Sequence, residues 1–146
     1  IKDSEARSLA RGDLKSSFKR RLIAFHLNDF TRGEPDLWNF DEIVKDDIDL
    51  KPSRKGYTLT GEVQLKSKNG ERWFHCKLYG EIENKGEDLS RFDVVARGTF
   101  KGLGKFTKNG PPGEFTLAIA TKLADPNDEA SKVPPQAALN SDNYFK

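Results

Sequence analysis

The clearest pattern along the chain is a pair of alternating runs on either side of Asn69-Gly70. An Asn-Gly pair between two such runs is typical of a two-residue β-hairpin turn. With Lys68 opposite Glu71, one side of the hairpin carries apolar or aromatic residues and glycine, in the pairs Leu65 with Phe74, Val63 with Cys76, Gly61 with Leu78, Leu59 with Gly80 and Tyr57 with Ile82. A shift by one residue would mix this set with the polar set, so the pattern predicts this register.

Two more alternating runs follow the hairpin. The runs from Leu89 to Lys101 and from Glu114 to Ala124 each place apolar residues at every second position. Turn signals separate the runs, so we expect four consecutive antiparallel strands that share one apolar face. Gly61, Gly80 and Gly98 fall on that face in mid-strand, where glycine lets a sheet coil or another element pack closely.

A helical period precedes the strands. Apolar residues three and four positions apart draw one stripe along a helix, at Leu14, Phe18, Leu22 and Phe25, and a second apolar side is added by Ile23, Leu27 and Phe30. Asp13 is a suitable N-cap for this helix, and Gly33 is a suitable end. The charged, weakly periodic residues 1–12 are interpreted as a frayed lead-in.

Residues 34–50 are strongly acidic, with Lys45 as their single basic residue. Asn39 and Glu42 have the spacing of a capping box, which predicts a short helix over about Phe40 to Lys45. The remainder is interpreted as a solvated acidic connector. Its Asp46-Asp47-Ile48-Asp49 run lacks the spacing and the glycine of an EF-hand, so we assign no metal site there.

Together these elements predict an α+β domain over residues 13–124, with the N-terminal helix packed in a strongly curved four-stranded antiparallel meander. Residues 125–146 are rich in Pro, Asn, Asp and Ser and are interpreted as an extended tail, whose final Tyr144-Phe145 either folds back or engages a partner. From Asp13 to Ala124 the order of elements resembles the cystatin-like and nuclear-transport-factor-like α+β rolls. That resemblance is one of topology, and it implies a sheet wrapped around the helix.

Composition narrows the classes of partner and the cell compartment only partly. The 25 basic and 23 acidic residues nearly balance, so charge gives no reason to expect nucleic acid as a partner. The chain has no apolar run of membrane-spanning length, and its single Cys76 excludes an internal disulfide. The chain starts at Ile1 without a methionine, which is explained by removal of an export signal, in a secreted or periplasmic protein, or by trimming.

Aromatic side chains on the outer side of the hairpin are the main candidates for binding. Trp73, His75 and Tyr79 occupy alternate positions of one strand and so share one side. With Trp38 they are the predicted ligand- or partner-binding residues, although the tail, residues 38–50 or a second copy of the chain could instead cover them. No catalytic residue, metal or cofactor is assigned. His75 and Cys76 point to opposite faces of a strand, and His26 is interpreted as an ordinary packed helix residue.

Three functional hypotheses follow. The first is a non-enzymatic module that binds a partner protein or a small apolar ligand, with a homodimer through the outer sheet face as one form. The second is a small cavity enzyme of the lyase, isomerase or hydrolase type, in which Asp41 or Asp93 works with His75 or Tyr79. The third is a structural interaction protein that acts through its C-terminal tail.

Overall fold

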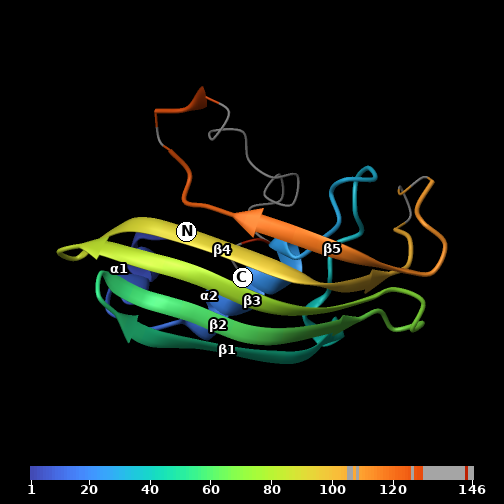
Figure 1. The fold of residues 1–146 in the computed structure, drawn as a ribbon, viewed down its shortest axis with the longest axis horizontal. Coiled ribbons are helices and arrows are strands. Elements are labelled where there is room, and N and C mark those ends of the chain that lie inside the picture. Colours follow the sequence, from blue (N-terminus) through green and yellow to red (C-terminus); the bar gives the residue numbers. More distant parts are fainter. Residues whose placement is uncertain (105–106, 108, 126, 130–143, 145–146) are drawn as a thin grey trace.

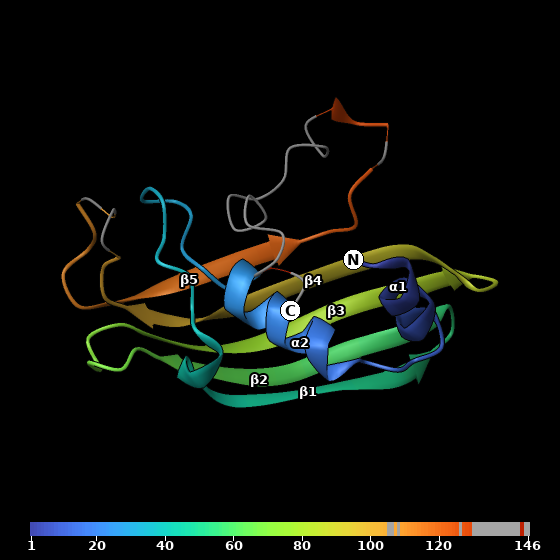
Figure 2. The same cartoon turned by 180° about the vertical axis from the view of Figure 1, so that it is seen from behind.

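The chain folds into one antiparallel β-sheet with its helices packed on one face (Figures 1 and 2). The structure is a computed structural model that describes residues 1–104, 107, 109–125, 127–129 and 144. The helical elements are α1 (Asp3–Ala10), α2 (Ser16–Arg21), its continuation as a π-helical turn, η1 (Leu22–His26), and a 3-10 turn, η2 (Phe40–Glu42). The strands follow in chain order as β1 (Ile43–Ser53), β2 (Gly56–Lys66), β3 (Trp73–Lys85), β4 (Asp88–Lys101) and β5 (Glu114–Thr121).

The predicted hairpin is confirmed in its register. β2 and β3 pair antiparallel, with Leu65 opposite Phe74 at one end and Tyr57 opposite Ile82 at the other, and each predicted pair between them is present. The turn itself differs from the predicted two-residue turn: strand pairing ends at Lys66 and Trp73, and the Gly70 N–H donates to the carbonyl of Ser67 at 2.8 Å, so Lys68 and Asn69 are its central residues. Gly70 follows them with a φ of 74°, a left-handed backbone that glycine adopts without steric cost. The alternation of β4 is also confirmed, because Phe92, Val94, Ala96 and Phe100 are all buried.

The sheet has a fifth strand that the sequence did not predict. The predicted helix over residues 40–45 and the acidic connector after it are wrong. Only the single turn η2 forms, with Glu42 accepting the backbone N–H of Asn39 at 2.8 Å, and the acidic run then enters β1. β1 pairs with β2 at the edge of the sheet, where its outward-facing acids remain in solvent, and Ile48 alone is deeply buried. The predicted count of four strands is therefore corrected to five.

The helical region also differs from the prediction. Residues 1–12 are not frayed, because α1 lies within them and buries Leu9. The main helix begins after Lys15 rather than Asp13 and leaves the helical path at Leu27, well before Gly33. Phe30 therefore lies beyond the helix and is 49% exposed, not part of a second apolar side.

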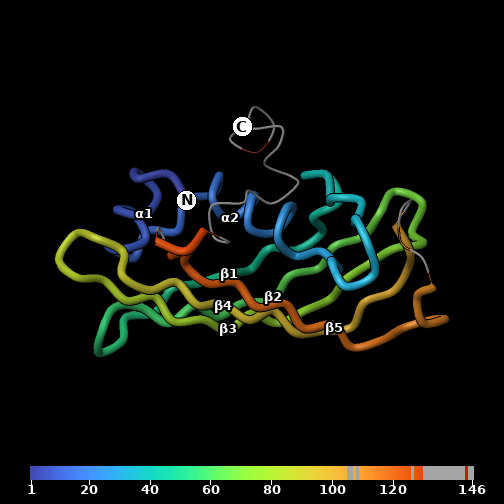
Figure 3. Tube along the Cα trace, turned by 90° about the horizontal axis from the view of Figure 1, so that it is seen from above, coloured from blue at the N-terminus to red at the C-terminus, as the bar shows by residue number. Residues whose placement is uncertain are grey.

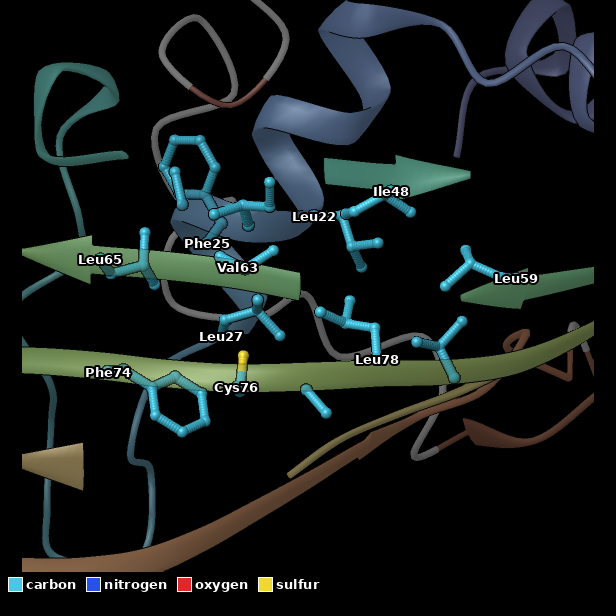
Figure 4. Close-up of a cluster of buried hydrophobic side chains, with 14 of the residues drawn as sticks. Leu22, Phe25, Leu27, Ile48, Leu59, Val63, Leu65, Phe74, Cys76 and Leu78 are labelled. Carbon is cyan, nitrogen blue, oxygen red and sulfur yellow. The ribbon is translucent and has the colours of Figure 1, made fainter. Parts of the chain in front are cut away.

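The core lies between the helices and the inner face of the sheet. Figure 4 shows Leu22 and Phe25 of the helix above Val63 of β2 and above Cys76 and Leu78 of β3. Gly98 lets adjacent strands approach at this face, since a Cβ there would lie 1.9 Å from the carbonyl oxygen of His75. That close approach accounts for one of the mid-strand glycines seen in the sequence.

The sheet is open, with β1 and β5 at its two edges (Figure 1), and in the edge-on view the helices lie on one side of it (Figure 3). The architecture is therefore α+β, with a small N-terminal helical layer on a five-stranded antiparallel sheet. Among the described residues, no helix is both long enough and apolar enough to cross a membrane. In the tail, Tyr144 packs back on the body, whereas Phe145 and the Val133-Pro134-Pro135 segment lie outside the described residues.

Candidate functional site

The outer face of the sheet carries three of the predicted binding residues. Trp73, His75 and Tyr79 lie on the side of β3 that faces away from the helices, and the ring centroids of Trp73 and His75 are 4.7 Å apart. Tyr79 is 58% exposed, and its cross-strand neighbour Val95 on β4 is 44% exposed. The described part of the chain leaves these two neighbouring side chains open to solvent.

Trp38 is not part of that surface. It is 2% exposed, its Nε1–H donates to the carbonyl of Leu27 at 2.9 Å, and its ring packs near Phe100. The guanidinium of Arg72 lies 3.8 Å from the centre of its ring, a cation–π contact that the burial of both groups strengthens. Trp38 is therefore a core residue, held against the segment that follows η1.

On the opposite side of the molecule a cavity lies between the α2–η1 helix and the β4–β5 side of the sheet. This helix–β5 cavity has a volume of about 500 Å³. Its apolar walls come from Phe18 and Leu22 on the helix, Phe92 on β4 and Leu123 after β5. Arg21, His26, Thr121, Lys122 and Tyr144 supply its polar groups. A pocket with mainly apolar walls and a few convergent polar groups is the usual form of a small-molecule site.

A chain of polar contacts runs along one wall of the helix–β5 cavity. Arg21 Nη2 lies 2.5 Å from Glu5 Oε2 in an ion pair whose side chains are 3% and 6% exposed. Arg21 also hydrogen-bonds Tyr144, and its guanidinium carbon lies 5.5 Å from the centre of that ring. The hydroxyl of Tyr144 lies 2.7 Å from Nε2 of His26. The Glu5–Arg21 ion pair of this network is buried, whereas the neutral pair, His26 with Tyr144, lines the cavity wall.

Burial sets the protonation of the neutral part. Burial lowers the pKa of His26, and the positive charge of Arg21 acts in the same direction, so the imidazole is neutral at pH 7. Burial raises the pKa of Tyr144 and outweighs the hydrogen bond from Arg21, so its phenol stays protonated. A neutral imidazole and a phenol can each give or accept one hydrogen bond, and together they can orient a polar atom of a ligand.

The π-helical turn places His26 at this wall. In η1 the backbone hydrogen bonds span one residue more than in an α-helix, and such turns are frequent at functional sites. His26 also borders a second hollow of about 510 Å³, formed with Phe30, Pro35 and Ile119. No sequence signal indicates this role, because His26 has the position of an ordinary core histidine and Tyr144 lies 118 positions further along the chain.

Two other candidates carry less chemistry. A hollow of about 580 Å³ beside the β2–β3 turn is lined mainly by charged and polar groups, among them Asp36, Glu42, Lys68 and Arg72. Asp41 pairs with Lys68 at 2.8 Å, and Asp93 pairs with Arg91 on the outer face, so neither approaches a histidine among the contacts described. Within the described ranges, no three His, Cys, Asp or Glu side chains are grouped so that they could hold a metal ion.

Comparisons with known proteins identify no relative of this chain. The chain matches no protein-family model, and searches of curated proteins and of solved structures find no significant match. Any functional conclusion therefore depends on the geometry of the described residues.

Proposed function

We propose that the protein is a non-enzymatic binding module that takes one small, largely apolar molecule into the helix–β5 cavity. The observation that carries the proposal is the combination of an apolar cavity of about 500 Å³ with the His26–Tyr144 pair on its wall. The apolar walls supply the free energy of binding through removal of surface from water. The pair supplies orientation, because a ligand that leaves its hydrogen-bonding capacity unmet binds less well.

The topology supports the same proposal. A helical layer followed by a long antiparallel meander resembles the cystatin-like and nuclear-transport-factor-like rolls, and we propose that this chain is a five-stranded relative in shape. In such an arrangement a short helix cannot cover a long sheet, so space remains beside its end. Fold alone does not assign a function, and the cavity carries the argument.

The experiment is a fluorescence titration with 1-anilinonaphthalene-8-sulfonate, an aromatic anion that brightens in apolar sites, followed by competition with decanoate. We expect saturable binding of one probe per chain and displacement by decanoate. Thr121→Trp places an indole in the cavity and is expected to abolish binding. Ala118→Trp is the matched control, since Ala118 is exposed on the outer side of the same strand. Circular dichroism and melting curves establish that both variants fold.

Native mass spectrometry gives a second readout that needs no probe. A mass excess per chain that disappears on denaturation is expected if the purified protein retains its ligand. The proposal fails if folded wild-type protein shows neither saturable probe binding nor bound mass, or if Thr121→Trp binds the probe as tightly as Ala118→Trp does.

A further inference from the structure

We infer that the outer face of the sheet is a self-complementary interface through which two copies of this chain form a face-to-face dimer. The inference does not depend on the proposed ligand, because the helix–β5 cavity lies on the other side of the sheet. It starts from Tyr79 and Val95, two large side chains left exposed side by side on adjacent strands. A second copy is favoured over other partners by the order of charges around them.

The strand register fixes which outer-face residues share a row across the sheet. One row runs Asp47, Glu62, Lys77, Arg97 from β1 to β4, with acids on the first two strands and bases on the next two. The neighbouring row runs Asp49, Thr60, Tyr79, Val95. Asp47 is 72% exposed and Glu62 43% exposed in their side chains, so this charge pattern is presented to solvent.

A two-fold axis that lies in the interface, parallel to the strands and midway between β2 and β3, places each β1 residue opposite β4 of the partner and each β2 residue opposite the partner's β3. In the charged row, Asp47 then faces Arg97 and Glu62 faces Lys77, each contact occurring twice by symmetry. One edge of the interface gains a third pair of opposite charges, Lys51 with Asp93.

In the row of Tyr79 the same operation places Val95 opposite Asp49 of the partner. Tyr79 faces Thr60, and Trp73 faces Lys66, an arrangement suited to a cation–π contact. His75 faces Gln64, and the same-row alignment brings no two like charges into direct opposition. Aligned sheets cross at about 30°, which displaces the outer strands by about one residue, within the reach of lysine and arginine side chains.

The size of the face is sufficient for a stable pair. Four overlapping strands at about 4.8 Å spacing and ten residues at about 3.3 Å each cover about 19 Å by 33 Å. Side chains make the accessible surface of this face larger than its flat area. It therefore approaches the value of about 800 Å² per partner that specific complexes bury. Tyr79 and Val95 lie within this area, with charged rows on both sides, and an apolar centre with a polar rim is the usual anatomy of an interface.

The test uses charge reversal and sedimentation velocity, with light scattering as a second measure of mass. Wild-type protein is expected to dimerise at micromolar concentration. Arg97→Glu alone and Asp47→Arg alone each create two like-charge contacts per dimer, so each is expected to weaken association at least about 100-fold. Glu87→Arg, in the exposed β3–β4 turn, is the control and is expected to dimerise like wild type.

Mixing the two single variants is the decisive step. In a heterodimer of Arg97→Glu with Asp47→Arg, both contacts again join opposite charges, so two monomeric proteins are expected to associate when combined. Recovery of the dimer in the mixture also shows that each variant is folded. A wild-type protein that stays monomeric up to high micromolar concentration overturns the inference, and so does a dimer that both single variants leave intact.

Discussion

Removal of the carboxylate of Glu5 is expected to be among the most damaging changes of a single charge in this protein. Glu5 and Arg21 form an ion pair at 2.5 Å with side chains 6% and 3% exposed, and the pair joins α1 to α2. In Glu5→Gln the guanidinium stays buried without its counter-ion, which typically costs about 3–5 kcal/mol of unfolding free energy. For a chain of this length that corresponds to a fall in Tm of about 10–16 °C.

The assay is urea unfolding followed by tryptophan fluorescence, which reports on buried Trp38. Asp13→Asn is the matched control. It breaks an ion pair with Lys15 of the same 2.5 Å length whose side chains are 52% and 53% exposed, and such surface pairs contribute at most about 1 kcal/mol. The double variant Glu5→Leu/Arg21→Met removes both buried charges and is expected to recover most of the loss, because an apolar replacement leaves no unpaired ion.

The stability loss in Glu5→Gln is expected to depend on pH, and the pKa of Glu5 determines the direction of that dependence. Burial by itself would raise the pKa of Glu5, but the hydrogen bonds from Arg21 and from the backbone N–H of Lys2, together with the positive charges of these two residues, outweigh it, so the folded-state pKa lies below the ordinary value of 4.5. The pair therefore contributes its full stability above pH 4.5 and loses it as the pH falls through the lower folded-state value. The stability difference between wild type and Glu5→Gln should shrink below pH 4.5. Equal losses in Glu5→Gln and Asp13→Asn, or a difference that grows in acid, would refute the reasoning.

Two further predictions concern the sheet. Gly98→Ala is expected to lower the free energy of unfolding in urea by about 3 kcal/mol, because its new Cβ would lie 1.9 Å from the carbonyl oxygen of His75. Thr99→Ala, at the neighbouring position on the outer side of β4, should lower it far less. Equal losses in the two variants would contradict the close approach of the strands at Gly98. Cys76 is expected to resist a disulfide exchange reagent at pH 8 in the folded protein, because it is buried and burial raises the pKa of its thiol to about 12. In concentrated guanidinium chloride it should react at once, and fast reaction of the native protein would place the thiol at the surface.

The sheet could be predicted from the sequence where two independent signals agreed. The Asn69-Gly70 turn and the parity of both flanking runs support the same register, and the pairs from Leu65–Phe74 to Tyr57–Ile82 are present as predicted. β1 gave no such agreement. Acidic residues dominate the composition of β1, and Ile48 is its only fully buried residue. The sequence of this edge strand therefore looks like that of a solvated connector.

The candidate site could be predicted only in part. Trp73, His75 and Tyr79 share the outer face because strand parity places them there. Trp38 lies in the core because the chain after η1 turns back to the end of that helix, where the Trp38 indole donates to the carbonyl of Leu27, a tertiary contact that no local sequence pattern indicates. The helix–β5 cavity assembles residues from five separate parts of the chain, and the contact between His26 and Tyr144 is visible only once the chain is folded.

The acidic composition of β1 has a consequence for solubility. A long, open edge strand offers unpaired backbone groups to any other strand, and this is a common route to fibrils. Two β1 edges brought together would oppose Asp46, Asp47 and Asp49 of one chain to those of another, and Pro52 removes a backbone donor near the end of the strand. The acidic side chains that hide the strand pattern of β1 in the sequence thus also oppose aggregation of the protein by edge-to-edge strand pairing.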